Sequence, residues 1–373
     1  MADLNTNLEK LVWVASNPKK QLDGYLQNGK KVVGCFPYYT PQLLADAAGM
    51  VPMGLWGAQT EVSLAKSYLP SFACPVMFSN LELSLKGKYK GLSAALIPVM
   101  CDTMRNTSQD FKKGNPDIKT IIFTHPQNRK VAAALDFLVT EYVEVKEKLE
   151  ELSGKKIDDD AIAKSIDTYN THSRAVREFS QLANNHLDII TPVVRHAVMK
   201  SAQFMTKAEH TAILKDINSQ LSERPKYDFK GKRIILTGIT AEPDQLLEIF
   251  IEHNMAVVGD DLSQEMRQYR TDIPAEGTPM ERLAKQWLFT DDPMAHDERV
   301  QRGELLLNLV KENKADGVIL CLMKFCDPEE YEYPTYQKML SEAKVPVLSI
   351  DIDQQPAGYD QARTRIHTFA EIL

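Results

Sequence analysis

The stretch KVVGCFPYYTPQLLADAAG, residues 31–49, contains the pattern that decides the fold. Its first part, from Lys31 to Phe36, is an apolar run with the length of a buried strand. A helix is predicted after Pro41, and Gly49 ends it, because glycine commonly follows the last turn of a helix. A strand that leads within a few residues into a helix is the repeating unit of a parallel α/β sheet.

The same alternation recurs on both sides of this stretch. Further apolar, strand-like runs cover residues 94–100, 118–123, 233–238, 256–261, 317–322 and 345–350. The segment 129–221 lies between the predicted strands 118–123 and 233–238. In it, apolar residues recur at three- and four-residue spacing among charged residues, which is typical of amphipathic helices. The sequence therefore predicts an α/β protein with two doubly wound, mostly parallel sheet lobes and an intervening helical segment. The predicted boundaries are 1–130, 131–226 and 227–373.

Composition limits the classes of function. The chain has 373 residues, of which 43% are hydrophobic, so it can bury a sizeable core. Its formal net charge of −7 argues against a nucleic-acid partner, because phosphate binding needs a concentrated excess of Lys and Arg. The apolar runs are too short to span a bilayer, and the polar first residues lack a signal-peptide pattern. We therefore expect a cytoplasmic protein with no membrane contact.

Five cysteines without a secretion signal predict metal binding or burial rather than disulfides. Cys101 directly follows the strand 94–100, and Cys326 lies just beyond the strand 317–322. Cys74 lies in a proline-flanked loop that opens a helix. Open parallel sheets bind ligands beyond the carboxyl ends of their strands, so these three are candidate ligands. Cys35 and Cys321 fall inside predicted strands and are interpreted as core residues.

Spacing alone does not decide the role of the three candidate cysteines. No CxxC pair is present, so a structural zinc site has little support. A cubane cluster normally takes four cysteines, and three would leave one iron with a ligand from outside the protein. On the residues alone, separately buried and inert thiols are the better interpretation.

Longer phrases around these cysteines resemble a known family, the smaller subunit of the ATP-activated 2-hydroxyacyl-CoA dehydratases. The phrases are GMVPMGLWG at 49–57, PVMCDT at 98–103, THPQNR at 124–129, DDLSQE at 260–265, MKFCDPEEY at 323–331 and DQQ at 353–355. The resemblance runs from about residue 10 to the C-terminus. It implies one [4Fe–4S] cluster held by Cys74, Cys101 and Cys326, and it gives Cys35 and Cys321 no ligand role.

The resemblance also implies a reaction and a set of partners. Family members eliminate water from (R)-2-hydroxyacyl-CoA to give (E)-2-enoyl-CoA through a ketyl radical, which makes the unactivated C3–H acidic. An ATP-dependent iron–sulfur activator protein injects the electron. Substrate binds at the cluster of a larger homologous subunit, at or near the interface of a heterodimer. A chain like this one would relay the electron, and no catalytic base is assigned to it.

Three alternative functions are considered. A benzoyl-CoA reductase-type subunit shares the fold and the activator. A double-cubane reductase needs about six cysteine ligands in one chain, more than this chain has. A CoA-ester binding protein without metal or catalysis is the third. The substrate is left open among 2-hydroxyglutaryl-, 2-hydroxyisocaproyl-, phenyllactyl- and lactoyl-CoA.

Several other residues have two interpretations each. Asp102 and Asp327 could orient loop N–H groups towards the cluster or be helix N-caps. Arg105, Asn106, Ser108 and Gln109 could contact the acyl group of the substrate or form a solvated turn. His125 is interpreted as structural. The aromatic residues Tyr38, Tyr39 and Trp56 could pack in the core or contact an acyl-CoA.

Overall fold

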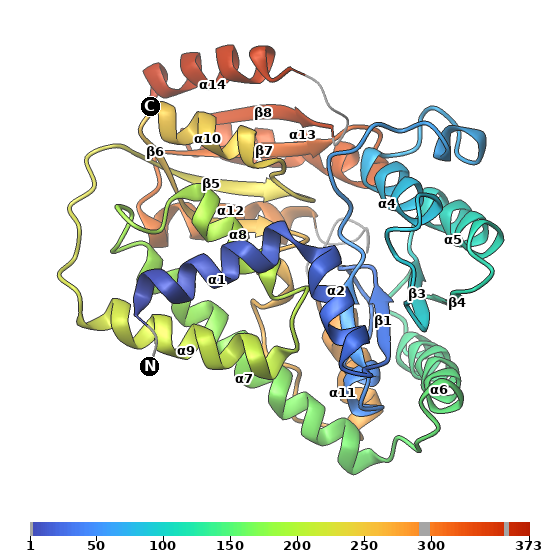
Figure 1. Ribbon diagram of the computed structural model, residues 1–373. Helices are drawn as coiled ribbons and strands as arrows, with labels where there is room; N and C mark the ends of the chain where they lie inside the picture. Colours follow the sequence, from blue (N-terminus) through green and yellow to red (C-terminus); the bar gives the residue numbers. More distant parts are fainter. Residues whose placement is uncertain (1–2, 291–298, 354–357) are drawn as a thin grey trace.

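The computed structural model describes residues 3–290, 299–353 and 358–373 and contains two parallel sheets (Figure 1). The first sheet has the order β2-β1-β3-β4, with β1 Val32–Cys35, β2 Val51–Gly54, β3 Ala94–Val99 and β4 Lys119–Thr124. The second has the order β6-β5-β7-β8, with β5 Lys232–Gly238, β6 Met255–Leu262, β7 Gly317–Met323 and β8 Val347–Ile352. Every pairing between these strands is parallel, so the predicted fold class is confirmed.

The two sheets share one topology. In each, the second strand along the chain lies outside the first, and the third and fourth strands follow on the other side. The strand order therefore reverses between β1 and β3 in one sheet and between β5 and β7 in the other. Such switch points open a crevice at the carboxyl ends of the strands, where open α/β sheets bind ligands. The two lobes thus repeat one topology, although no residue-level repeat is apparent in the sequence.

Strand β2 was not predicted from the sequence. It contains Pro52, which cannot donate a hydrogen bond to a neighbouring strand and therefore argues against a central position. The structure places β2 at the edge of its sheet, where Val33 of β1 is in register with Pro52. A strand with one neighbour tolerates the missing donor.

Helices cover both faces of the sheets and fill the segment between them. They are α1 Leu4–Ser16, α2 Pro18–Gln27, α3 Gln42–Ala47, α4 Pro75–Leu85, α5 Asp102–Gly114, α6 Ala133–Ser153, α7 Asp159–Ala183, α8 Pro192–Ser201, α9 Lys207–Glu223, α10 Asp244–Glu252, α11 Pro279–Leu288, α12 Arg299–Asn313, α13 Asp327–Glu342 and α14 Asp360–Ile372, with short 3₁₀ turns at Ala65–Ser67 and Met266–Gln268. The helices α6 to α9 occupy the predicted helical stretch. Local signals explain their starts: Asp158 caps α7, and Thr206 forms a capping box with Glu209 in α9.

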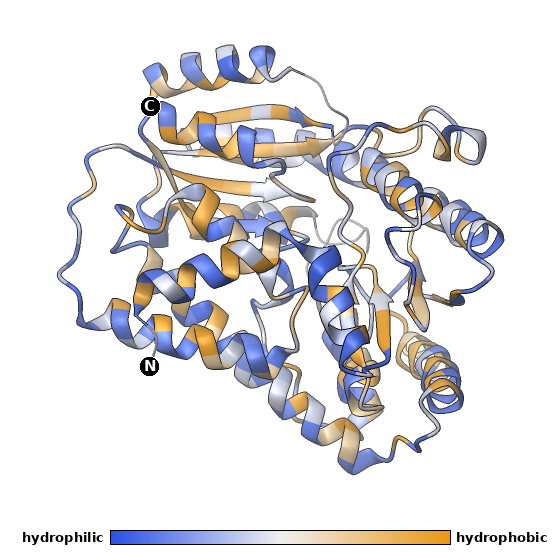
Figure 2. Cartoon of the chain, in the orientation of Figure 1, coloured by the Kyte–Doolittle hydropathy of each residue, from blue (hydrophilic) through white to orange (hydrophobic). Residues whose placement is uncertain are grey.

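One hydrophobic core joins the two lobes. It contains residues of β1 and α4 together with residues of β5 and β7, and the outer face of each sheet has a separate core. Helix α11 belongs to the C-terminal third of the sequence, yet Met280, Leu283 and Leu288 pack into the core that covers the first sheet. Apolar residues follow the strands in Figure 2, while α7 and α9 carry polar residues on their outer sides.

A buried ionic network fixes the start of α13. The carboxylate of Asp261, at the end of β6, accepts hydrogen bonds from Arg302 at 3.0 Å and from Arg267 at 3.2 Å, and it also pairs with Arg270. The same two arginines, Arg267 and Arg302, each lie 3.7 Å from the carboxylate of Glu329 in the first turn of α13. Removing one member of a buried ion pair typically costs about 3–5 kcal/mol. The network therefore holds the segment that contains Cys326 against the end of the second sheet.

No helix in the described part of the chain is both long and apolar enough to cross a membrane.

Candidate iron–sulfur site

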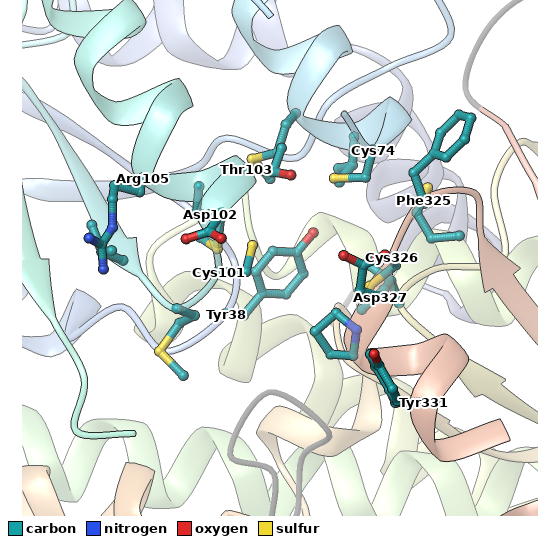
Figure 3. A pocket seen from close by; sticks show the side chains of 18 of the residues that line it. Tyr38, Cys74, Cys101, Asp102, Thr103, Arg105, Phe325, Cys326, Asp327 and Tyr331 are labelled. Carbon is teal, nitrogen blue, oxygen red and sulfur yellow. The ribbon is translucent and has the colours of Figure 1, made fainter. Parts of the chain in front are cut away.

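The three candidate cysteines line one cavity. It has a volume of about 390 Å³ and is bounded by the carboxyl ends of β3 and β7 and by the starts of three helices. Figure 3 shows Cys74, Cys101 and Cys326 around it, with Tyr38 among them. Cys101 and Cys326 follow the third strand of their respective sheets, so they occupy equivalent positions in the two lobes. The crevices of both switch points open into this cavity.

Each cysteine is the N-cap of a helix. Cys74 precedes α4, Cys101 precedes α5 and Cys326 precedes α13. The first N–H groups of a helix have no partner within the helix, and its N-terminus carries the positive end of the helix dipole. Three helix N-termini that border one cavity form a site that favours an anionic occupant.

Burial dominates the ionisation of the three thiols. It raises the pKa of Cys74 to about 12, and it also raises the pKa of Cys101 and Cys326. The N–H of the third residue of each helix acts in the opposite direction and lowers the thiol pKa, although no sulfur forms a capping hydrogen bond. The thiols are close enough to raise one another's pKa, as Cys101 does for Cys74.

A left-handed residue directs Cys326 into the cavity. Phe325 has φ +60°, which is strained for a bulky side chain, and such residues gather at functional sites. The turn brings the N–H of Cys326 to 3.0 Å from the carbonyl of Met323, so the chain reverses immediately after β7. A helix can then start at Asp327 with its N-terminus towards the cavity.

The donor set fits a cluster better than a single ion. In the described residues, no group of three or more His, Cys, Asp or Glu side chains is placed to hold one metal ion. A cubane makes a different demand, because each cysteine binds a different iron atom and the sulfurs need not converge on one point. All three cysteines are free thiols, and a cluster bound by thiolates is anionic, which suits the helix N-termini.

The two remaining cysteines are core residues, as predicted. Cys35 lies in β1 and Cys321 in β7, both completely buried. Neither belongs to the lining of the cavity.

The acidic neighbours of two cysteines are not N-caps. Asp102 and Asp327 are the first residues inside α5 and α13, because the cap positions are taken by Cys101 and Cys326. Their exposed carboxylates line the cavity and contribute to the raised pKa of Cys101. Acidic residues in the first turn also interact favourably with the helix dipole.

The polar residues after Cys101 divide into two groups. Arg105 lines the cavity (Figure 3), so it remains a candidate for ligand contact. Ser108 is buried and donates its hydroxyl to the Arg105 carbonyl at 2.7 Å, which excludes it from such a role. Asn106 and Gln109 are exposed and lie outside the lining.

Other candidate residues have structural environments. His125 is buried, and its Nε2–H donates to the Tyr39 carbonyl at 2.8 Å; burial lowers its pKa to about 4, so the ring is neutral at pH 7. Trp56 is buried against His196 and Phe204, away from the cysteines. Of the phrase at 353–355, Gln354 and Gln355 lie outside the described residues.

Sequence reasoning missed part of the lining. From the sequence, Tyr38 has only aromatic packing or acyl-CoA contact as candidate roles, and Phe325 and Tyr331 are not candidate site residues. All three line the cavity, and the rings of Phe325 and Tyr331 are exposed. Tyr38 lies three residues beyond the end of β1, as Cys326 lies three residues beyond β7, so the rule that selected Cys326 could have selected it. No sequence signal reports the exposure of the other two rings.

Fold and cavity together define a class: a two-lobed, doubly wound α/β protein whose two switch points meet at a crevice with three thiols. The profile of the family HGD-D, described as 2-hydroxyglutaryl-CoA dehydratase, D-component, matches residues 37–373. The chain belongs to this family.

Curated relatives agree along almost the whole length. The (R)-phenyllactyl-CoA dehydratase beta subunit of Clostridium sporogenes is 43% identical over 96% of each chain. The lactoyl-CoA dehydratase subunit beta of Anaerotignum propionicum is 43% identical over 100% of each. More distantly, a benzoyl-CoA reductase subunit of Thauera aromatica is 29% identical over 98% of this chain and 95% of its own. The predicted family resemblance is confirmed.

Proposed function

We propose that this chain is the iron–sulfur subunit of a 2-hydroxyacyl-CoA dehydratase and holds a [4Fe–4S] cluster on Cys74, Cys101 and Cys326. One observation carries the proposal: three free thiols, each at the N-terminus of a helix, line a single cavity where the two sheets open. When bound, such a cluster would supply one-electron chemistry. Its unligated corner would take a ligand from outside the protein.

The protein's own part is to bind the cluster and set its environment. The three thiols must lose their protons to bind iron, and burial opposes this loss in the metal-free chain, so assembly releases protons. The helix N-termini stabilise the resulting negative charge. The carboxylates of Asp102 and Asp327 have the opposite effect. Negative charge near a cluster disfavours its reduction, so they lower its reduction potential. Acidic neighbours suit a donor of low-potential electrons.

The proposed reaction converts (R)-2-hydroxyacyl-CoA into (E)-2-enoyl-CoA and water. The C2 hydroxyl leaves, a proton leaves C3, and one electron is borrowed and returned, so no net oxidation occurs. We assign substrate binding and the base to the larger homologous subunit, and delivery of the electron to an ATP-dependent iron–sulfur activator in the cytoplasm. The higher identity to the dehydratase subunits favours this reaction over a benzoyl-CoA reductase type.

The mouth of the cavity supplies a docking face for the larger subunit. Phe325 and Tyr331 line the cavity and are exposed by 49% and 75%, and Phe72, two residues before Cys74, is exposed by 68%. We call these three rings the mouth patch. Exposed aromatic rings are enriched at the energetic centres of protein interfaces. A partner seated there would lie close to the cluster, as electron transfer requires.

Charged substitutions in the mouth patch test both the interface and the function. Phe72→Asp and Tyr331→Asp should each weaken binding of the larger subunit at least tenfold, a loss of about 1.4 kcal/mol or more. Titration calorimetry measures the binding. The same variants are then mixed with the larger subunit, activator, ATP, reductant and 2-hydroxyacyl-CoA esters. Their rate of enoyl-CoA formation should fall in proportion to the fraction of the chain that is no longer bound to the larger subunit.

Ile372→Asp is the matched control, because Ile372 is exposed by 68% but lies on α14, away from the cavity. It should leave binding and turnover unchanged. Equal effects of all three substitutions would contradict the assignment of the docking face. Absence of enoyl-CoA from the complete wild-type complex with every ester would contradict the proposed reaction.

A further inference from the structure

A second cavity lies beside the first sheet, at the carboxyl end of its edge strand β2. It has a volume of about 410 Å³ and is lined by the end of β2 and the loop after it, the start of α2 and the end of α4. Its lining shares no residue with the cavity of the three cysteines. Small-molecule sites typically have volumes of about 300–1,000 Å³, and open parallel sheets bind ligands beyond the carboxyl ends of their strands.

The phrase GMVPMGLWG at 49–57, which the cysteine site does not use, builds this second cavity. Residues 53–57 of the phrase belong to the lining. Gly57 has φ +87°, in the left-handed region, so the chain leaves β2 through a turn that favours glycine. The floor of the cavity is apolar and consists of buried side chains, those of Leu22, Met53, Leu55, Trp56, Leu92 and Phe204.

The charged side chains of the lining are all cationic. Lys19, Lys20 and Lys88 belong to it, and it contains no aspartate or glutamate. Lys19 pairs with Asp23, one turn further along α2. The other two lysines are exposed and form no ion pair with any residue that the structure describes. Lys20 and Lys88 are therefore available to an anionic group of a ligand.

The start of α2 favours the same charge. Asn17 is the N-cap of this ten-residue helix but forms no side-chain capping hydrogen bond, and its amide nitrogen donates to the Trp13 carbonyl at 2.9 Å. The first N–H groups of α2 thus lack a capping side chain at the border of the cavity. Together with the helix dipole they favour an anion. An apolar floor beside this positive charge matches a molecule with an apolar body and one anionic group.

We propose that the second cavity binds an amphipathic organic anion, with its acyl or aryl group on the apolar floor and its carboxylate or phosphate at Lys20 and Lys88. Burial of the apolar group supplies affinity, and the two ammonium groups fix the orientation of the ligand. The site is separate from the cysteine cavity, because α4 lies between them. Cys74 precedes this eleven-residue helix and Leu83 near its end lines the second cavity, a span of about 16 Å.

The test measures binding of anilinonaphthalene sulfonate, an aryl anion, to the full chain by titration calorimetry. Lys20→Glu combined with Lys88→Glu should weaken binding at least about fivefold, because each attraction becomes a repulsion. Ala58→Phe should weaken binding without a change of charge, because Ala58 belongs to the lining and the larger ring fills part of the cavity. Raising sodium chloride from about 0.05 to about 0.5 M should weaken binding to the wild type but not to the lysine variant.

Lys164→Glu combined with Lys215→Glu is the matched control. Both lysines are exposed, lie on α7 and α9 outside the lining, and give the same change in net charge. This variant should bind the probe as the wild type does. Decanoate and hexanoyl-CoA are then added as competitors. Displacement by decanoate alone identifies a free carboxylate as the ligand, and displacement by hexanoyl-CoA alone identifies a CoA ester.

Absence of probe binding by the wild type, or displacement by neither competitor, would overturn the inference. Unchanged affinity in Ala58→Phe would also overturn it, because the apolar group would then bind elsewhere, and so would equal losses in the two pairs of lysine substitutions. If Ala58→Phe does not fold, the lysine pairs and the salt dependence decide. None of these results depends on iron, so failure of this inference leaves the proposed function intact.

Discussion

Replacement of Cys74, Cys101 or Cys326 by serine should reduce the iron content of the anaerobically purified chain at least about tenfold, the scale on which metal sites respond to loss of support. Serine has nearly the size of cysteine, so the cavity keeps its shape while the soft thiolate that iron prefers is lost. Each of the three should have the same effect, because a cubane held by two cysteines has two open corners. Iron and acid-labile sulfide assays measure the outcome.

The controls are Cys35→Ala and Cys321→Ala. Both cysteines are completely buried in strands and outside the cavity lining, so alanine leaves a small hole without removing a ligand. These variants should be somewhat less stable but should contain the wild-type amount of iron. An empty site in Cys321→Ala combined with a full site in Cys326→Ser would contradict the ligand assignment.

The isolated chain should form no enoyl-CoA above background, even with activator, ATP, reductant and a panel of 2-hydroxyacyl-CoA esters. One set of three cysteines provides for one cubane, whereas the proposed division of labour needs a relay cluster and a second cluster that binds substrate. Addition of the larger homologous subunit should restore turnover. Liquid chromatography of the CoA esters measures both states.

A control isolates the role of this chain in that assay. The Cys101→Ser variant of this chain should still bind the larger subunit, because its mouth patch is intact. The resulting complex should be inactive, because the variant lacks the cluster. Robust turnover by the isolated wild-type chain would contradict the relay role and favour a homodimeric enzyme. Substrate preference in the active complex would identify the acyl group.

The strands were predictable where the sequence has continuous apolar runs with clear ends. The runs at 94–100 and 317–322 correspond to β3 and β7, because central parallel strands are buried on both faces. β2 escaped prediction because it is only four residues long and is interrupted by Pro52, which has no N–H for the hydrogen bonds of a sheet. The packing of α11 on the first sheet depends on tertiary contacts that no local pattern encodes.

The candidate site was predictable to the extent that it follows from strand ends. Cys101 and Cys326 were selected by their positions after strands, and the structure places both, with Cys74, around one cavity. That Asp102 and Asp327 lie inside their helices rather than at the caps depends on one-residue helix boundaries, which sequence patterns locate poorly. The approach of the two lobes, which brings Cys326 to Cys101, required the full fold.

The most direct test of the central claim is the iron and acid-labile sulfide content of the wild-type chain purified without oxygen. A cubane on three cysteines predicts about four irons and four sulfides per chain, a brown colour, and loss of both on exposure to air, because one iron lacks a protein thiolate. A colourless, folded chain with neither iron nor sulfide, both before and after anaerobic reconstitution, would contradict the assignment of Cys74, Cys101 and Cys326 as cluster ligands.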